Sequence, residues 1–134
     1  MFPVIKIAHT TLPEQYSPIV FNQFYETFPE GFLVAEEHHK IIGFIAGLKL
    51  AAGTAKILML AISEKQRRHG IGSALLTEFV QAVIRQKIHQ VELEVRTHNI
   101  PAIKFYKKQG FAITDTIPGF YQNKEDAYVM RRRV

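Results

Sequence analysis

The 134-residue chain contains no cysteine. This absence excludes disulfide bonds, zinc sites built on thiolates and cysteine nucleophiles, and with them several classes of enzyme. The chain also lacks internal repeats and long tracts of proline, glycine or serine, so its composition is that of an ordinary globular protein. A chain of this length can bury a core without disulfides or metal ions, and we expect one domain over residues 1–134.

Long hydrophobic runs are also absent. No stretch approaches the length needed to span a bilayer, and the first residues lack the basic segment, apolar run and cleavage site of a secretory signal. We therefore expect a soluble, cytoplasmic protein that does not bind a membrane.

Acidic residues are outnumbered by basic ones, which gives a formal net charge of +5. The sign alone does not distinguish a nucleic acid, a membrane or a phosphorylated cofactor as the anionic partner. Part of the excess lies in Arg131–Arg133, which we interpret as a solvated tail, with a nucleic-acid contact as the alternative. No basic segment is interleaved with aromatic residues as in an RNA-recognition motif, so no nucleic-acid partner is expected.

The front of the chain predicts a strand over residues 2–8 and then a helix. Thr11 and Glu14 have the spacing of a capping box, and apolar residues continue with helical spacing as far as Phe28. The helix is expected to end near Pro29 and Gly31.

Strand signals dominate the next part of the chain. Two β-rich runs, residues 32–35 and 41–48, are separated by a polar segment, which predicts a hairpin. Residues 56–62 are apolar almost throughout, which is typical of a central strand buried on both faces.

The second half predicts a strand, helix, strand order that requires a parallel pair. A helix over 72–84 is followed by an alternating strand over 91–96, and Asn99 is a natural N-cap for a further helix over 101–109. Residues 111–117 and 126–131 predict a closing antiparallel hairpin. The fold class is therefore α/β (α+β), with a mixed, mostly antiparallel sheet flanked by helices.

A glycine-containing turn, Gln66–Ser73, lies between the strand over 56–62 and the helix over 72–84. Its glycines let backbone N–H groups approach an anion, and the following helix start adds the positive end of its dipole. Arg67 and Arg68 would add charge-assisted contacts to phosphate. Taken alone, the glycine spacing fits a pyrophosphate site and a purely structural loop equally well. The motifs G-x-G-x-x-G and G-x-x-x-x-G-K-[ST] are absent, so NAD and ATP are poor candidates.

Two motifs resemble those of a known family. Arg67-x-x-Gly70-x-Gly72 resembles the acetyl-CoA signature Q/R-x-x-G-x-G/A of the GCN5-related N-acetyltransferases (GNAT). Residues 93–111 are similar to that family's L-E-V-R-x-x-N-x-x-A-x-x-x-Y-x-x-x-G-F segment. Residues 28–36 and 119–130 also resemble protein N-terminal acetyltransferases, in the branch of the ribosomal-protein-S18 alanine and archaeal Ard1-like enzymes.

The resemblance implies a GNAT fold in which the central parallel pair splays to admit acetyl-CoA. Backbone groups of the buried strand would align the pantetheine arm, the glycine turn would hold the pyrophosphate, and a helix cap would contact the arm. The implied contacts are Leu60, Ala61, Ile62, Arg67, Arg68, His69, Gly70, Ile71, Gly72, Ser73 and Asn99.

Catalytic roles also follow from the resemblance. Tyr106 occupies the general-acid position, although an aromatic residue beside Phe105 is also typical of core packing. Glu94 occupies the general-base position of the S18-type enzymes. Glu92 points to the same face of the alternating strand, so it can substitute for Glu94, or both can belong to a solvated face. Tyr121 would hydrogen-bond a peptide acceptor, or is a surface tyrosine in a turn.

The front of the chain departs from the family pattern, because residues 11–28 alone separate its first two expected strands. Relatives usually place two helices and a loop there, and that loop forms one wall of the acceptor pocket. No His, Asp and Glu grouping has a metal-site spacing, and the family chemistry needs no metal.

The sequence predicts an acyl-CoA-dependent N-acetyltransferase that acts as a monomer or homodimer. Near pH 7 roughly one in seven α-amines is neutral, against roughly one in 2,500 lysine side chains, so a weak base such as Glu94 suits the α-amine of a peptide or protein N-terminus. The alternatives are a small amine such as a polyamine or amino sugar, a lysine side chain, and a non-catalytic acyl-CoA-binding module.

Overall fold

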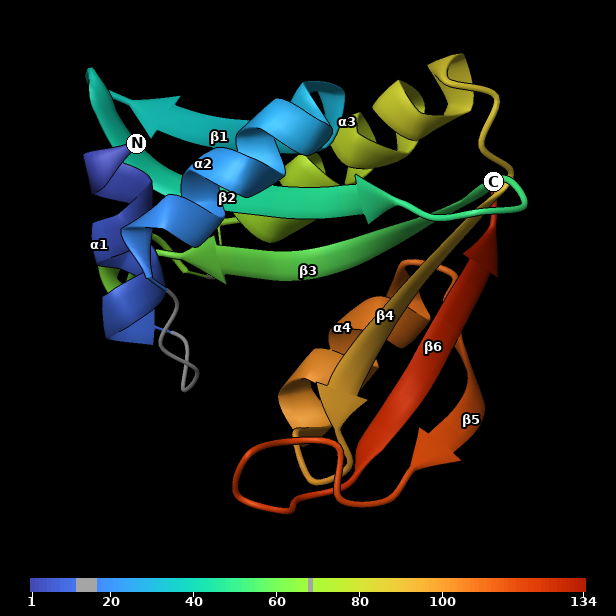
Figure 1. Ribbon diagram of the computed structural model, residues 1–134. Coiled ribbons are helices and arrows are strands. Elements are labelled where there is room, and N and C mark those ends of the chain that lie inside the picture. Colours follow the sequence, from blue (N-terminus) through green and yellow to red (C-terminus); the bar gives the residue numbers. More distant parts are fainter. Residues whose placement is uncertain (12–16, 68) are drawn as a thin grey trace.

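The structure, a computed structural model, describes residues 1–11, 17–67 and 69–134. Its six-stranded sheet has the order β1-β2-β3-β4-β6-β5. Strands β3 and β4 run parallel, and every other neighbouring pair is antiparallel (Figure 1). The predicted mixed sheet with one central parallel pair is therefore confirmed. The strands are β1 (Phe32–Glu37), β2 (Lys40–Lys49), β3 (Thr54–Ile62), β4 (Gln90–Arg96), β5 (Ala112–Ile117) and β6 (Ala127–Arg133).

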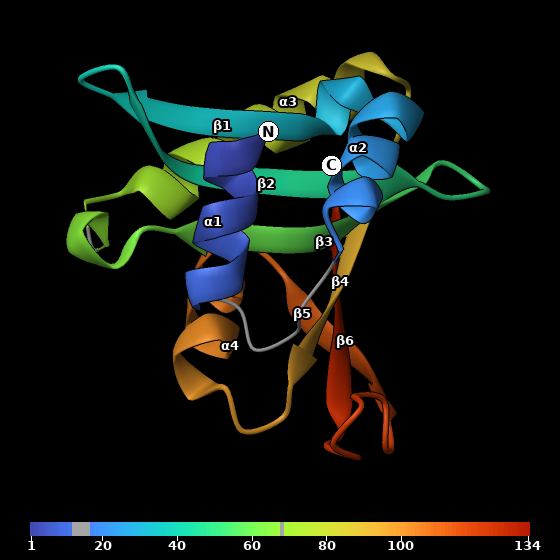
Figure 2. The same ribbon diagram turned by 60° about the vertical axis from the view of Figure 1, so that its left-hand side comes forward.

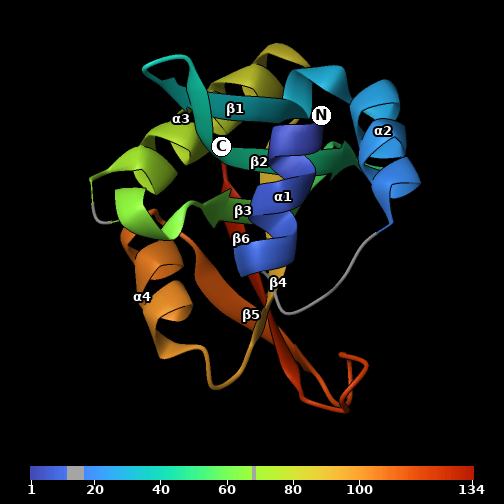
Figure 3. The same ribbon diagram turned by 90° about the vertical axis from the view of Figure 1, so that its left-hand side faces the viewer.

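Helices cover both faces of the sheet. The helices are α1 (Phe2–Thr11), α2 (Pro18–Thr27), α3 (Ile71–Arg85) and α4 (Ile100–Lys108). Figures 2 and 3 show α1 and α2 on one face, with α3 on the opposite one. The hairpins and the two later helices lie where the sequence predicts them, but β6 extends through Arg133 and pairs there with β4, so the expectation of a solvated tail at Arg131–Arg133 is wrong. None of the described helices is long and apolar enough to cross a membrane.

The strand predicted over residues 2–8 is wrong, because these residues form α1. Val4, Ile7 and Ala8 are buried and follow a helical i, i+3, i+4 spacing. They pack with Phe21 of α2 against the face formed by β2 and β3. Two helices therefore precede β1, and the expectation of a single shortened helix there is wrong as well. Glu14 of the predicted capping box lies outside the described residues.

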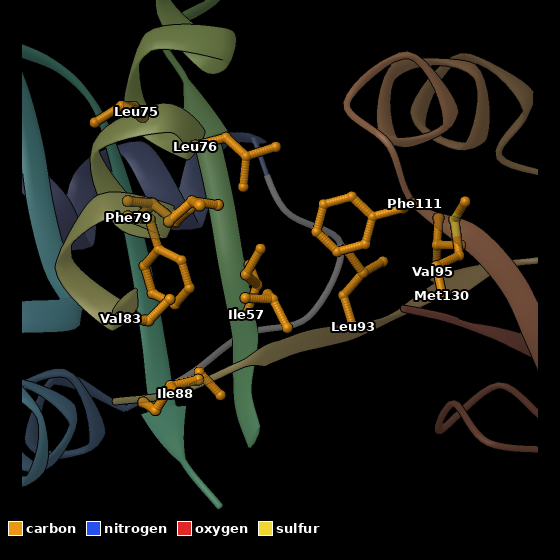
Figure 4. Packing of buried hydrophobic residues seen from close by; sticks show 14 of the residues in the cluster. Ile57, Leu75, Leu76, Phe79, Val83, Ile88, Leu93, Val95, Phe111 and Met130 are labelled. Carbon is orange, nitrogen blue, oxygen red and sulfur yellow. The ribbon is translucent and has the colours of Figure 1, made fainter. Parts of the chain in front are cut away.

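The larger part of the core lies under α3 and α4. Phe79 of α3 and Ile57 of β3 pack in the same cluster as Leu93 of β4 and Met130 of β6 (Figure 4). Met59, two residues beyond Ile57, belongs instead to the cluster under α1 and α2. Strand β3 is thus buried on both faces, as predicted.

A β-bulge explains why two residues of β3 that are two apart face opposite sides. Ala46 pairs with Met59 and Gly47 pairs with Ile57, so Leu58 has no partner on β2. A bulge of this kind bends its strand and increases the local twist. The parallel pairing of β3 with β4 ends at Lys56 and Glu92, and beyond that point the strands diverge (Figure 1). This is the splay implied by the family resemblance.

Candidate active site

A cavity of about 650 Å³ lies at the end of β3, between the start of α3 and α4. Most of the predicted cofactor contacts line it. They are Leu60, Ala61, Ile62, Arg67, Gly70, Ile71, Gly72, Ser73 and Asn99. His69 is exposed and is not among the lining residues, and Arg68 lies outside the described residues.

The start of α3 presents backbone donors to this cavity. Gly70 is the N-cap and has φ +75°, a left-handed conformation that glycine adopts without steric cost. The N–H of Ala74 makes a helical bond to the carbonyl of Gly70 at 3.0 Å. The N–H groups that precede Ala74 have no hydrogen-bond acceptor within the helix, because the helix has no carbonyl one turn before them. Together with the helix dipole, these groups form an anion site.

Side-chain bonds hold the surroundings of this turn in place. Arg67 donates from Nε to the carbonyl of Ile62 at 3.2 Å, which ties the turn to the end of β3. Gln109, just after α4, donates from Nε2 to Ser73 Oγ at 2.8 Å and thereby joins that helix to the start of α3. Asn99 Oδ1 accepts from the N–H of Ala102 at 3.3 Å, which confirms the predicted cap of α4.

Backbone groups of β3 face the gap left by β4. The N–H of Ser63 donates to the carbonyl of Ile42 on β2. Because backbone groups alternate in direction along an antiparallel strand, those of Leu60 and Ile62 point away from β2. The β3–β4 ladder has already ended at Lys56, so Leu60 offers an N–H and a carbonyl to a molecule bound in the gap.

A second cavity of about 360 Å³ adjoins the first, since both are lined by Leu60, Asn99, Ala102 and Tyr106. The second cavity is also lined by Glu94, Tyr121 and Phe120. The proposed acid, base and acceptor-binding tyrosine therefore surround one space. Gln66, Pro101, Ala102 and Phe105 also line the first cavity without having been singled out in the sequence.

Tyr106 lies where the two cavities meet. Its ring contacts Phe105 and Phe111, with centroids 5.1 and 5.6 Å apart. This residue therefore packs in the core and also lines both cavities. Although part of Tyr106 is exposed, burial among protein atoms raises its pKa above the usual range, and the nearby Tyr121 raises it further. The side chain is therefore held as a neutral hydroxyl.

The two glutamates of β4 have different surroundings. Glu94 lines the second cavity and pairs with Lys56 of β3, with Nζ 2.8 Å from Oε1. Glu92 pairs with Arg131 of β6, with Nε 3.4 Å from Oε1, and lines neither cavity. Lys56 is a site residue that sequence reasoning missed. Its signal was a single charged residue inside an otherwise apolar central strand.

The loop between β5 and β6 forms another wall of the second cavity. The guanidinium carbon of Arg96 lies 3.9 Å from the centroid of the Tyr121 ring, and Arg96 Nε lies 3.6 Å from Glu125 Oε1. Glu125 also contacts His98 and accepts from the N–H of Tyr121 through its carbonyl at 3.2 Å. These contacts join the end of β4 to the loop that carries Tyr121. No local sequence pattern indicates them.

Within the described residues, no group of three or more His, Asp or Glu side chains is arranged to hold a metal ion. The chemistry available at the site comes from the Glu94 carboxylate, the phenols of Tyr106 and Tyr121, basic side chains such as Lys56, exposed backbone donors and a helix start. A helix start that can bind an anion, next to a phenol and a carboxylate, suits acyl transfer from a phosphorylated donor to an amine.

Comparison with known proteins agrees with this arrangement. A sequence model described as "Acetyltransferase (GNAT) family" matches residues 2–111. The chain belongs to this family. It is therefore an acyl-CoA-dependent N-acetyltransferase.

Particular relatives narrow the comparison. An N-alpha-acetyltransferase of Sulfurisphaera tokodaii is 34% identical over an alignment of 139 positions, which covers 95% of this chain and 83% of the relative. The crystal structure of Ard1 from Thermoplasma volcanium is similar with a TM-score of 0.94 and 41% identity, covering 98% of this chain and 88% of that one. Arabidopsis thaliana Naa50, in complex with the bisubstrate analogue CoA-Ac-MVNAL, has a TM-score of 0.82 and 31% identity, covering 96% and 88%.

Proposed function

We propose that the chain transfers the acetyl group of acetyl-CoA to the α-amine of a peptide or protein N-terminus. The observation that carries this proposal is the pair of adjoining cavities, which share Tyr106 and of which the second contains Glu94. A donor in the first cavity and an amine in the second would meet at the tyrosine. The similarity to an N-alpha-acetyltransferase and to a Naa50 structure with a peptide-bearing analogue supports the N-terminal acceptor.

The first cavity offers acetyl-CoA two sets of backbone groups, at the start of α3 and along β3. The start of α3 would bind the pyrophosphate, because its free N–H groups and dipole favour an anion. The outward-facing backbone groups of Leu60 and Ile62 on β3 would hydrogen-bond the amide groups of the pantetheine arm, as an adjacent strand would. This arrangement directs the thioester toward Tyr106 at the junction.

The second cavity, which we call the acceptor cavity, contains the groups for proton transfer. Glu94 takes a proton from the amine while the nitrogen forms a bond to the thioester carbonyl carbon. The carbon–sulfur bond then breaks, and the hydroxyl of Tyr106 gives its proton to the leaving thiolate. Lys56 binds Oε1 of Glu94, which fixes the carboxylate and leaves its other oxygen to receive the proton. Glu92, held by Arg131, serves no step in this arrangement.

The front of the molecule removes one argument for a small-amine acceptor. A shortened front half that left the pocket open would favour a small amine, but α1 and α2 are both present before β1. A non-catalytic acyl-CoA-binding module would not need an acid and a base at the acceptor cavity. The position of both Glu94 and Tyr106 there therefore argues against that alternative.

Mass spectrometry of products tests the proposal. The protein is incubated with acetyl-CoA and a mixture of free-N-terminus peptides, α-blocked lysine peptides, polyamines and amino sugars. Acetyl groups on α-amines are expected, and the acetylated peptides reveal the preferred first residues. Modification of lysines or small amines alone would retain the enzyme class and overturn the acceptor.

A further inference from the structure

A lysine amine lies inside the acceptor cavity, in contact with the carboxylate proposed as the base. Nζ of Lys56 is 2.8 Å from Oε1 of Glu94, and the two side chains are 24% and 12% exposed. Both residues line the acceptor cavity together with Tyr106, and Lys56 is the only lysine among the described residues that line it. A primary amine is therefore already within hydrogen-bond reach of the group that would take the proton from an acceptor amine.

The pairing of β3 with β4 explains the position of this amine. Lys56 is paired with Glu92 in the parallel ladder, and Glu94 lies on the same face of β4 because side chains two residues apart on a strand share a face. Glu92 is bound by Arg131, whereas Lys56 contacts Glu94. The ladder ends at Lys56 and Glu92, so the amine lies where the two strands begin to diverge.

A structural ion pair alone does not require a lysine at this position. A side chain that only held the carboxylate of Glu94 in place could equally be an arginine, which binds carboxylates well. Lysine differs in having a primary amine, which is a nucleophile once it has lost its proton. A primary amine is also the group that an N-acetyltransferase modifies. The position and the chemistry of Lys56 are therefore both those of an acceptor.

We propose that Lys56 is an internal acceptor, which the protein acetylates when acetyl-CoA is bound and no other amine occupies the acceptor cavity. This inference rests on the proposed roles of Glu94 and Tyr106. The Lys56 ammonium loses one proton to solvent, and Glu94 takes a second proton as the nitrogen forms a bond to the thioester carbonyl carbon. The carbon–sulfur bond then breaks, and Tyr106 protonates the thiolate. The net change is one thioester broken, one amide formed and one proton released.

The location of the amine offsets the low reactivity of a lysine. Lysine amines are almost all protonated near neutral pH, so this reaction is slower than transfer to an α-amine. However, the Lys56 amine is held beside the base, and no second molecule has to be bound and oriented first. A peptide N-terminus in the acceptor cavity would compete with Lys56 for the acetyl group.

Acetylation of Lys56 would inactivate the site. N-acetyl-lysine is uncharged, so the ion pair with Glu94 is lost. The added acetyl group also takes up space in a cavity of about 360 Å³. Both changes oppose the binding and deprotonation of a peptide amine. The protein would therefore lose activity when acetyl-CoA is abundant and acceptors are scarce, and bound acceptors would protect it.

Peptide mapping by tandem mass spectrometry tests the inference. The protein is incubated with isotopically labelled acetyl-CoA, with and without a mixture of free-N-terminus peptides, and is then digested. Without peptides, the label should accumulate on Lys56 at a rate per molecule that does not depend on the protein concentration. Saturating peptide should suppress this labelling. In Glu94→Gln the labelling should be about a hundredfold slower, because the base is lost.

A second measurement follows the activity that remains after preincubation with acetyl-CoA alone. The fraction of activity lost by the wild-type protein should equal the fraction of Lys56 that is acetylated. Each variant is compared with its own rate before preincubation. Lys56→Arg keeps a cation beside Glu94 but has no primary amine, so it should lose none of its activity. The matched control Lys40→Arg changes an exposed lysine at the start of β2, and it should lose as much activity as the wild-type protein.

The outcomes separate the internal acceptor from the proposed function. Acetylated peptides without label on Lys56 would overturn the internal acceptor and leave the proposed function intact. Equal labelling of Lys56 in the wild-type protein and Glu94→Gln, or a rate that rises with protein concentration, would mean chemical or intermolecular acetylation and would also overturn it. Label on Lys56 that depends on Glu94, without transfer to any peptide, would uphold the internal acceptor and count against a peptide acceptor.

Discussion

Tyr106 shows how one side chain serves both the core and the site. Its ring is fixed by edge-on contacts to Phe105 and Phe111, while its surface borders the two cavities. The packing gives the hydroxyl a defined position, and burial keeps it protonated because it raises the pKa. A proton donor for a thiolate needs a defined position and a proton to give, and the raised pKa secures that proton at the cost of a weaker acid.

Replacing Tyr106 by phenylalanine should lower kcat about a hundredfold or more, the typical contribution of a positioned acid. The ring and its packing remain, so the KM for acetyl-CoA and the fold should change little. Steady-state kinetics with acetyl-CoA and a free-N-terminus peptide that the wild-type protein acetylates, with circular dichroism as a check of folding, measures both. An unchanged kcat would leave Tyr106 with a packing role alone.

The two glutamates of β4 form a matched pair for testing the base. Each pairs with one basic side chain, but Glu94 lines the acceptor cavity and Glu92 does not. Glu94→Gln should lower kcat about a hundredfold, because the amide cannot accept the amine's proton. Glu92→Gln should retain nearly full activity, although it loses a comparable ion pair. The opposite result would move the base to Glu92.

At the scale of elements, hydrophobic periodicity predicts α3 but fails for α1. In α3 the buried residues Leu75, Leu76 and Phe79 repeat over a long helix, so the period is unambiguous. In α1 the buried stripe of Val4, Ile7 and Ala8 is short, and an apolar run of that length fits a strand equally well. Packing against β2 and β3 decides for the helix, and a local pattern does not contain that information.

The turn before α3 allows two neighbouring glycines to be compared. Gly70 has φ +75° with no atom within 4 Å of a built Cβ, so Gly70→Ala adds backbone strain without a clash. It should lower the free energy of unfolding by about 1 to 2 kcal/mol. Gly72 is helical and its built Cβ meets Phe105 at an ordinary 3.5 Å, so Gly72→Ala should be neutral or stabilising by up to about 1 kcal/mol.

Urea denaturation of the two alanine variants measures this difference. Equal free energies of unfolding would contradict the argument that Gly70 is required for its left-handed backbone. A Gly70→Ala protein that is destabilised but still binds CoA would show that the strained turn is tolerated in the bound state.

At the scale of the whole molecule, the sequence indicates the cofactor turn far better than the acceptor cavity. The turn is a continuous segment with its own motif, from Arg67 to Ser73. The acceptor cavity joins Lys56, Glu94 and Tyr121 from two strands and a distant loop. Those contacts depend on where β3 leaves β4, and the pairing of these strands ends at Lys56 and Glu92. The hydrophobic periodicity of a single sequence does not indicate which distant segments come together in this way.

The stability of the whole fold should report the environment of Tyr106 at alkaline pH. The pKa of Tyr106 is raised in the folded protein, first by burial and then by Tyr121. In the unfolded chain a tyrosine ionises near pH 10, so above that pH the unfolded state releases a proton that the folded state keeps. The stabilisation is therefore complete below about pH 10 and is lost as the pH rises toward the raised value.

Tyr106→Phe removes this contribution. The free energy of unfolding of the variant should therefore fall less between pH 9 and pH 11 than that of the wild-type protein. The expected difference is about 1.4 kcal/mol, the value for one proton over one pH unit. Urea denaturation at both pH values measures it, with Tyr25→Phe as the control because Tyr25 is 50% exposed on α2. That control should show the wild-type loss. An equal loss in Tyr106→Phe would mean that the Tyr106 hydroxyl ionises as readily in the folded protein as in the unfolded chain.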